Sequence, residues 1–332
     1  MRITDIARMA GVSVASVSRY FNQGQLSEET RERIAEVVRQ TGYNPSSQAV
    51  RLRKQETRLV ALITPRIHNQ PVAAVIEGIS VVLEKNGYQI ILANSGNDAK
   101  KELEFLQKYQ SKNVDGVIFI CGNFITPMHH KWLRSMRLPV VVAGQQVEGF
   151  ACVFQPDRQA AADIGQLFRR KGIRHPVMIS VNEAIKPFGI DRRDGFWEGY
   201  GRTEDGQNIP CVISSRMEPS AAYSAMFEVF AKYPDTDAIF CVADILVLGV
   251  YQYCEDYLIR IPEDISVAAV GGGLVTQGLR PKLTYAGLYH YKSGMVAAGQ
   301  LLQILQDKTT EVESVQMDYE LTLNESIKNT VG

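Results

Sequence analysis

Residues 3–24 read ITDIARMAGVSVASVSRYFNQG, and this stretch decides how the rest of the chain is interpreted. Apolar residues recur at helical spacing on both sides of Gly11, whose permissive backbone allows a tight turn. Thr4 is a candidate N-cap for a first helix, and Ser13 is a candidate N-cap for a second. The pattern predicts two short helices joined by a turn, as in a helix-turn-helix motif, and a helical hairpin inside a bundle is the alternative.

The second predicted helix presents two different faces. Val14, Val17 and Phe21 follow an i, i+3, i+7 spacing and form a stripe that would face a core. The opposite face carries Ala15, Ser16, Ser18, Arg19 and Asn22. Small side chains allow this face to approach base edges in a major groove, where Arg19 has the reach to donate to O6 and N7 of guanine. Val14 and Ala15 lie at the leading end of the helix and have no donor, so we expect them to contact thymine methyl groups.

A third helix is predicted after Ser27, with Glu28 and Glu29 in its first turn and Gly42 at its end. The candidate core of the three helices is Ile6, Val17, Phe21, Ile34 and Val38. Together the helices predict a compact DNA-binding unit over residues 1–45.

Residues 46–58 read SSQAVRLRKQETR and follow a proline that ends the helical pattern. Four cations crowd this segment, and Leu52 is apolar in a stretch too short to build a core of its own. Leu52 therefore either meets a partner chain or wedges into a minor groove, and we interpret the segment as a basic hinge and linker. A solvated linker is the alternative.

The formal net charge of the 332-residue chain is zero, but the charge is unevenly distributed. Residues 1–58 contain ten Lys or Arg against six Asp or Glu, so attraction to phosphate is concentrated at the N-terminus. No run approaches the roughly 20 apolar residues that a membrane helix needs, and no secretory signal pattern begins the chain. We therefore expect a cytoplasmic protein without a membrane segment.

The chemistry-bearing residues do not form the motifs of an enzyme. The five cysteines include no C-x-x-C pair and lie mostly among apolar neighbours, which predicts buried thiols in a reducing compartment. The five histidines lack metal-ligand spacing, and the Gly-rich phosphate-binding motifs and H-E-x-x-H are not present in the sequence. We expect neither catalysis nor a cofactor or metal. His68 and His290 are candidates for lining a ligand cleft, with a surface or core position as the alternative.

The segments DIARMAGVSVASVSRYFN at 5–22 and GYNPSSQAVRL at 42–52 resemble the headpiece and hinge of the LacI/GalR family of bacterial transcription regulators. The resemblance implies a homodimer that places two recognition helices in successive major grooves of a two-fold operator, with the hinge helices in the minor groove between them. It assigns base reading to Val14, Ala15 and Arg19, and phosphate or groove contacts to Thr4, Ser13, Ser18 and Asn22. In the hinge it assigns Ala49 and Leu52, with Leu52 as the wedge. The hinge departs from the family pattern at Ser46 and at the Ala49-Val50 pair.

From residue 59 onward, short apolar runs alternate with helical stretches. Buried strands are predicted at 59–65, 89–94, 114–120, 139–144, 175–180, 209–214, 237–242 and 265–270. Helices are predicted near 71–86, 99–112, 126–136, 195–200, 220–232 and 244–257. The alternation predicts two similar doubly wound α/β lobes, so the fold class is a small all-α headpiece followed by an α/β core.

The core over residues 59–332 also resembles the periplasmic sugar-binding-protein fold that serves the family as its effector and dimerisation domain. The strand at 283–288 and a helix at 293–307 are expected to cross back between the lobes, which makes the lobes discontinuous. The expected bounds are about 59–155 with 285–313 for one lobe, and about 156–284 with 314–332 for the other.

In such sheets ligands bind at the carboxyl ends of the strands. Arg66 and Gln145 directly follow predicted strands, and Gln155 follows the apolar run ACVF at 151–154. All three are effector-binding candidates, although a surface position is the alternative for Arg66. Arg192, in RRDGF, matches the family's R-x-x-G-F arginine, which contacts the effector. Asp244, in VAD, matches the aspartate of the family's A-N-D motif, whose asparagine is Ala243 here.

A second departure is the run from Gly271 to Gly273, where the family usually ends a strand in G-F-D. Losing that carboxylate removes repulsion toward an anion, and successive glycines are able to form a backbone nest for phosphate. Together with Arg66 and Arg192 this favours a phosphorylated sugar, and the family's trehalose and sucrose regulators similarly lack the aspartate. A glycine turn without a ligand role is the alternative.

We therefore expect a sequence-specific transcriptional regulator, a repressor of a sugar-utilisation operon, whose effector is a sugar or sugar phosphate and in our interpretation a disaccharide phosphate. A regulator that responds to a phosphorylated carrier protein as corepressor is one alternative. A sugar-binding protein without a gene-regulatory role is another, although it would have an export signal in place of the basic headpiece. The C-terminus shows no sustained leucine heptads, which favours a dimer over a tetramer.

Overall fold

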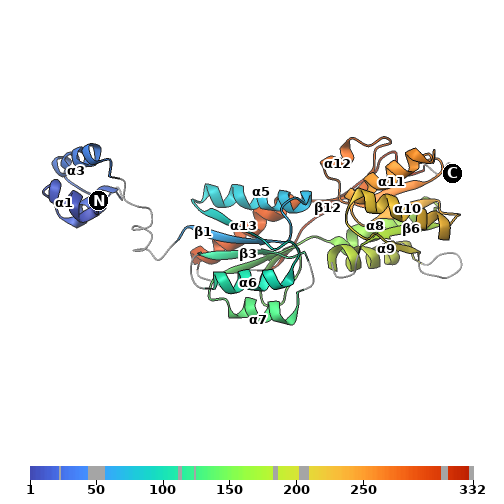
Figure 1. The fold of residues 1–332 in the computed structure, drawn as a ribbon, viewed down its shortest axis with the longest axis horizontal. Helices are drawn as coiled ribbons and strands as arrows, with labels where there is room; N and C mark the ends of the chain where they lie inside the picture. The colour runs from blue at the N-terminus through green and yellow to red at the C-terminus, as the bar shows by residue number, and fades with distance from the viewer. Residues whose placement is uncertain are drawn as a thin grey trace. The chain divides into compact units, whose positions relative to one another are not determined.

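The computed structural model describes residues 1–21, 24–43, 57–110, 114–122, 125–181, 186–201, 209–307 and 313–328. The chain divides into two compact units, residues 1–58 and residues 59–332. In Figure 1 the described part of the first unit is helical, and the second unit consists of two α/β lobes. The predictions made for Asn22, Ala49 and Leu52 fall outside the described residues.

The first unit is a three-helix bundle. Its helices are α1 (Ile3–Met9), α2 (Val14–Phe21) and α3 (Glu28–Thr41). Gly11 has φ of 63°, a left-handed conformation that favours glycine, and it lies in the turn between α1 and α2. The buried side chains are Ile6, Ala7, Ala10, Val17, Ile34 and Val37. The helix-turn-helix prediction is therefore confirmed, with Val37 rather than Val38 as the buried valine of α3.

Two of the three predicted helix caps are present. Ser13 Oγ accepts from the backbone N–H of Ser16 at 3.1 Å, and Ser27 Oγ accepts from that of Thr30 at 3.4 Å. The prediction for Thr4 is wrong, because Thr4 is the second residue of α1 and the N-cap is Arg2. The carboxylate of Asp5 accepts from the Arg2 backbone N–H at 2.8 Å, so the helix begins two residues earlier than expected.

The first lobe of the second unit is built on a parallel sheet with the strand order β11-β5-β4-β3-β1-β2. Its strands are β1 (Leu59–Thr64), β2 (Gln89–Asn94), β3 (Gly116–Ile120), β4 (Val140–Ala143), β5 (Ala151–Phe154) and β11 (Val315–Gln316). Figure 1 shows α5 (Gln70–Lys85) and α13 (His290–Asp307) on one face, and α6 (Ala99–Tyr109) and α7 (Pro127–Ser135) on the other. Successive strand residues are buried on opposite faces, so each face packs against its own helix pair.

The second lobe has the strand order β12-β10-β9-β8-β6-β7, in which only β12 runs antiparallel to its neighbour. Its strands are β6 (Pro176–Ser180), β7 (Cys211–Ile213), β8 (Ala238–Cys241), β9 (Ser266–Val270), β10 (Thr284–Leu288) and β12 (Tyr319–Thr322). Its helices are α8 (Asp157–Arg170), a short π-helix (Lys186–Asp191) that leads into α9 (Arg192–Tyr200), α10 (Pro219–Lys232), α11 (Asp244–Asp256) and α12 (Leu274–Gln277). The fold class predicted from the sequence is confirmed.

The chain passes between the lobes three times, after β5, between β10 and α13, and between β11 and β12. Two crossings differ from expectation by a few residues. Strand β10, which we expected to begin the return to the first lobe, pairs with β9 in the second sheet. Strand β11, which we expected in the second lobe, pairs with β5 in the first. The backbone hydrogen bonds of β10 and β11 decide to which sheet each strand belongs, and the apolar pattern does not reveal them.

The five cysteines are free thiols, and all except the half-buried Cys211 are buried. Burial raises the pKa of the Cys254 thiol to about 12. Across the described ranges no helix is long and apolar enough to span a bilayer.

Candidate functional site

Helix α2 presents one buried and one exposed face. Val17 is buried in the bundle, whereas Ser13, Ala15 and Arg19 are exposed, and Val14, Ser16 and Ser18 are half-buried. Thr4 is exposed on α1. The exposed face of α2 therefore carries small side chains and one long cation.

Gly24 supports the position of Arg19. Its backbone N–H donates to the Arg19 carbonyl oxygen at 2.8 Å, and a Cβ at position 24 would lie 3.3 Å from Arg19 Cβ and Cγ. A larger residue would press on the stem of the arginine. Gly24 thus packs against the stem of Arg19, and the Arg19 side chain stays exposed.

The second unit contains a cavity of about 350 Å³ where β4, β5 and β11 of the first lobe meet α8 and α9 of the second. Its lining residues are Gly144, Gln145, Gln146, Phe154, Gln155, Pro156, Asp157, Arg158, Gln159, Ala162, Asp191, Glu198 and Gln316. Side-chain amides dominate the polar lining. Gln145 and Gln155, singled out because they follow strands, both line this cavity.

The two amides have different hydrogen bonds. Gln145 Nε2 donates to Cys121 Sγ at 3.3 Å. Gln155 Oε1 is buried and has no hydrogen-bond partner among the described residues. A buried acceptor without a donor costs free energy, and a hydroxyl group in the cavity would relieve that cost.

Arg192 is 3% exposed and lies behind the cavity wall, not in it. Its Nε donates to Asp157 Oδ1 at 2.7 Å, and its Nη1 donates to the Val242 carbonyl oxygen at 2.6 Å. Asp157 itself lines the cavity. Direct contact of Arg192 with an effector stays a prediction, and Asp157, which lines the cavity, is the partner of its guanidinium.

His290 is the first residue of α13, at the crossing from the second lobe to the first. Burial, and to a smaller extent the nearby positive charge of Arg192, lowers the pKa of His290 to about 3. His290 is therefore neutral at physiological pH.

The glycine run does not form the phosphate nest that we expected. Asp244 is buried, and its Oδ2 accepts from the Gly273 backbone N–H at 2.8 Å. The Gly271 N–H donates to a carbonyl oxygen of β10 at 2.8 Å. Two of the three N–H groups are thus taken by the protein, and a carboxylate lies among them.

Packing explains why glycines occupy this turn. Gly271 has φ of 99°, and a Cβ at Gly272 would lie 2.0 Å from the Tyr285 ring. A Cβ at Gly273 would lie 2.5 Å from Gln70 Oε1. The alternative reading of a glycine turn without a ligand role agrees with this geometry.

The charges around the cavity also do not favour an anion. Arg66 is exposed after β1 and is not among the lining residues. Arg158, the single cation of the lining, donates from Nε to Glu198 Oε2 at 2.8 Å and lies 3.7 Å from Asp194. With the carboxylates of Asp157, Asp191 and Glu198 nearby, the described lining carries more acidic than basic groups.

Most of the lining residues other than Gln145 and Gln155 were not predicted from the sequence, and Asp157 and Gln316 illustrate why. Asp157 follows β5 and has no motif of its own, and Gln316 comes from the two-residue strand β11. The strand end before Asp157 is a usable signal. The position of Gln316 is set by long-range pairing, for which the local sequence holds no signal.

Comparison with known proteins extends along the whole chain. Residues 2–46 match the family described as bacterial regulatory proteins, lacI family, and residues 165–327 match the periplasmic binding protein-like domain. The sucrose operon repressor of Staphylococcus xylosus is 27% identical over 310 residues, which cover 93% of this chain and 95% of that protein. Catabolite control protein A of Priestia megaterium is 29% identical over 339 residues, covering 98% and 99%. The lac repressor dimer bound to operator shares the fold with a TM-score of 0.86 at 15% identity, covering 98% of each chain.

Proposed function

We propose that this chain, whose residues 2–46 match the family described as bacterial regulatory proteins, lacI family, is a DNA-binding transcriptional repressor of a sugar-utilisation operon. In this proposal it binds a two-fold operator as a homodimer and is controlled by a sugar in the cavity of its core. The observation that carries the proposal is the presence in one chain of an exposed, arginine-bearing recognition helix and an amide-lined cavity between two α/β lobes.

The exposed face of α2 supports the DNA part. Ala15 has no bulk to keep the helix from base edges, and Arg19 is exposed with the reach for guanine. The assignments of Thr4, Ser13, Val14, Ser16 and Ser18 as DNA contacts are part of the same proposal. The lac repressor to which the fold is similar was solved as a dimer bound to operator, which supports a two-fold operator here.

For the effector we infer a neutral, hydroxyl-rich ligand of disaccharide class, where the sequence had favoured a sugar phosphate. The amides of Gln145, Gln155 and Gln159 suit hydroxyl groups, and the orphaned Gln155 Oε1 needs a donor. A phosphate would meet three carboxylates and an arginine already bound to Glu198. The similarity to a sucrose operon repressor is consistent with such a ligand.

Control of DNA binding follows from linkage. A ligand that contacts both lobes stabilises one relation between them, and each of the three crossing segments transmits that preference. The two hinge segments of a dimer fit the operator in only one arrangement of the lobes. A ligand that favours or opposes this arrangement therefore changes the affinity for the operator. A coupling of about 1–3 kcal/mol is sufficient for a switch of roughly 5- to 150-fold.

The first experiment is a thermal-shift panel on the full chain with sucrose, trehalose, cellobiose and the 6-phosphates of sucrose and trehalose. A ligand that binds only the folded state at 100 times its Kd adds about 2.7 kcal/mol of stability. We expect a neutral disaccharide to raise Tm and Gln155→Ala to reduce that shift. A shift by phosphates alone would contradict the neutral-ligand inference, and no shift by any sugar would direct attention to a protein corepressor.

The operator is tested separately by selecting DNA fragments that bind the purified chain and measuring affinity by fluorescence anisotropy. We expect a sequence with two-fold symmetry and weaker binding when the effector is added. Binding to all fragments with equal affinity would contradict the repressor assignment, whatever the sugar panel shows.

A further inference from the structure

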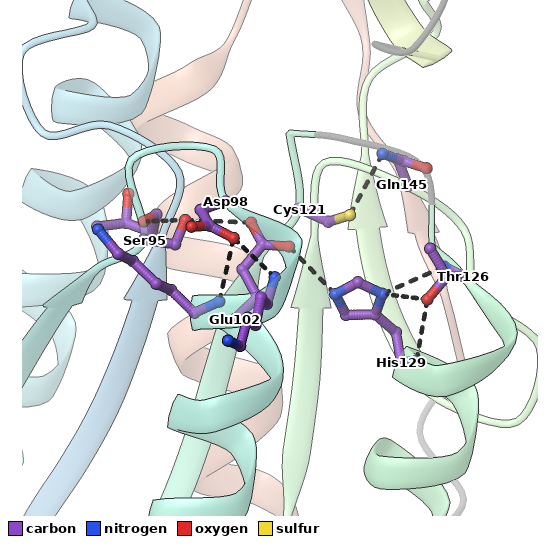
Figure 2. A network of polar contacts seen from close by, with 10 residues as sticks. Ser95, Asp98, Glu102, Cys121, Thr126, His129 and Gln145 are labelled. Carbon is purple, nitrogen blue, oxygen red and sulfur yellow. Dashed lines mark hydrogen bonds and ion pairs between the residues drawn. The ribbon is translucent and has the colours of Figure 1, made fainter.

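The first lobe buries a chain of polar side chains that the proposed function does not yet use (Figure 2). Glu102 of α6 is 2% exposed and His129 of α7 is 1% exposed. Glu102 Oε2 lies 3.1 Å from His129 Nε2, and Ser95 Oγ donates to Glu102 Oε1 at 3.1 Å. Burying a carboxyl group and an imidazole costs more than burying two apolar side chains of the same size. The pair therefore calls for a role beyond filling space.

The hydrogen bonds hold the imidazole in one orientation. The backbone N–H of Thr126 donates to His129 Nδ1 at 3.2 Å, and Thr126 Oγ1 lies 2.8 Å from the same atom. Because Nδ1 accepts, the ring hydrogen is on Nε2, from which it is donated to Glu102. Turning the ring would break a hydrogen bond on each side.

The fixed ring packs on strand β3. It is stacked on Phe119, with ring centroids 6.0 Å apart and planes at 15°. Phe119 and Cys121 are two residues apart and contribute to the same apolar cluster, so their side chains are on one face of the sheet. Cys121 Sγ accepts from Gln145 Nε2, and Gln145 lines the cavity. Figure 2 shows Cys121 and Gln145 beside the Glu102–His129 pair.

Gly144 allows Cys121 and Gln145 to lie close together. It has φ of 101°, and a Cβ at this position would lie 2.8 Å from the Cys121 carbonyl oxygen. Only a glycine allows the ends of β3 and β4 to approach so closely. Gln145, the next residue, is thereby placed beside the Cys121 thiol.

We propose that Glu102 and His129 are positioning residues for the cavity, which fix Phe119 and Cys121 and, through the thiol, the side-chain amide of Gln145. Neither residue is among the described residues that line the cavity. The ligand part rests on the proposed function, because it takes the cavity as the site of a hydroxyl-bearing effector. The part that concerns the ends of β3 and β4 does not depend on any ligand.

The ligand-free test is peptide-resolved hydrogen exchange on the full chain. In Glu102→Ala and His129→Leu we expect exchange over residues 119–122 and 143–147 to rise by about tenfold or more, since local opening governs exchange. Glu102→Gln keeps an acceptor for His129 Nε2 and should restore wild-type rates. Glu104→Ala and His130→Leu, on the same helices, are the matched controls. Unchanged rates at both segments, or an equal rise throughout the lobe, would overturn the proposal.

The ligand test is a double-mutant cycle by calorimetry with sucrose, trehalose and cellobiose. We expect His129→Leu to weaken binding by about tenfold in the wild-type background. When Gln145→Ala is present we expect a loss of less than about twofold, because the amide that His129 positions is then absent. Equal losses in both backgrounds would overturn it. If none of these sugars binds the wild-type chain, the effector class is wrong, and hydrogen exchange still decides the positioning role.

Discussion

Arg192 shows how one residue's role depends on a neighbour that no motif reveals. Its sequence context predicts an effector ligand, yet its guanidinium lies behind the cavity wall, bonded to Asp157 and to the Val242 carbonyl. By contrast, Gln145 and Gln155 line the cavity, because a residue that follows a parallel strand reaches the carboxyl edge of the sheet by construction. Strand ends were therefore informative, and charge partners were not. An isolated sequence position does not say which carboxylate will fold against an arginine.

Replacing Arg192 with Ala should lower the free energy of unfolding by about 3–5 kcal/mol, because the buried Asp157 carboxylate loses its charge partner. Urea denaturation measures the loss. Adding Asp157→Ala should recover part of it, since no stranded charge remains. Arg158→Ala, which breaks the more exposed pair with Glu198, is the control and should cost much less. Equal losses for Arg192 and Arg158 variants would show that the buried pair is energetically unimportant.

Replacing Arg19 with Ala should weaken specific operator binding by about 1–3 kcal/mol, the contribution of one bidentate contact to guanine. Because Arg19 is exposed, the thermal stability of the chain should not change. Fluorescence anisotropy with the selected operator and with an unrelated duplex measures both affinities. A parallel fall on both duplexes would identify a phosphate contact in place of base reading.

At the scale of elements, the apolar runs predicted the central strands to within about two residues. Strand β2 begins and ends at the expected residues. Strands β1 and β9 differ from the expected bounds by one residue at one end, and β8 differs by one residue at both ends. Strands β1, β8 and β9 are covered on both faces, so nearly every residue is apolar and the apolar run itself marks the strand. Helix α8 and the edge strands β11 and β12 were not predicted. The edge strands are short and partly exposed, so their sequences carry no comparable signal.

Helices α8 and α9 pack so closely that glycines are required at their contact. A Cβ at Gly199 would lie 1.9 Å from the Ala162 carbonyl oxygen. We expect Gly199→Ala to destabilise the core by about 1–3 kcal/mol or more through overpacking. The control is Gly299→Ala in α13, where nothing lies within 4 Å of the added Cβ and helix propensity should stabilise by about 0.5–1 kcal/mol. Urea denaturation of both variants gives opposite signs if the contact is as close as described.

At the scale of the molecule, the three crossings join two lobes, and one crossing contains a half-buried histidine. His290 starts α13 in the first lobe, and the charge of Arg192 in the second lobe acts on it. Its pKa of about 3 lies below the ordinary value of 6.5, so between these values the unfolded chain binds a proton that the folded chain does not. The free energy of unfolding is therefore unaffected by this histidine above pH 6.5, and it decreases as the pH falls below 6.5.

Between pH 7.5 and pH 5 the loss due to His290 should be about 2 kcal/mol, given 1.36 kcal/mol per pH unit below 6.5. His290→Gln has no such titration and should show a flatter dependence of unfolding free energy on pH over this range. Denaturation curves at pH 5, 6 and 7.5 make the comparison. Parallel curves for the two proteins would place the histidine in a solvated environment.

The return of the chain to its first lobe also bears on how the protein is made. Strands β1 to β5 are synthesised first, and β6 to β10 of the second lobe follow. Helix α13, which packs on the sheet of the first lobe beside α5, is synthesised only after β10. Until α13 is made, α5 is the only one of the two helices covering this sheet face that the nascent chain contains, and the apolar surface left exposed favours aggregation. We expect a stalled nascent chain ending at Leu288 to be readily cleaved by protease within residues 59–154, and one extended beyond α13 to be protected. We therefore expect chaperones to bind the nascent first lobe until α13 has been synthesised.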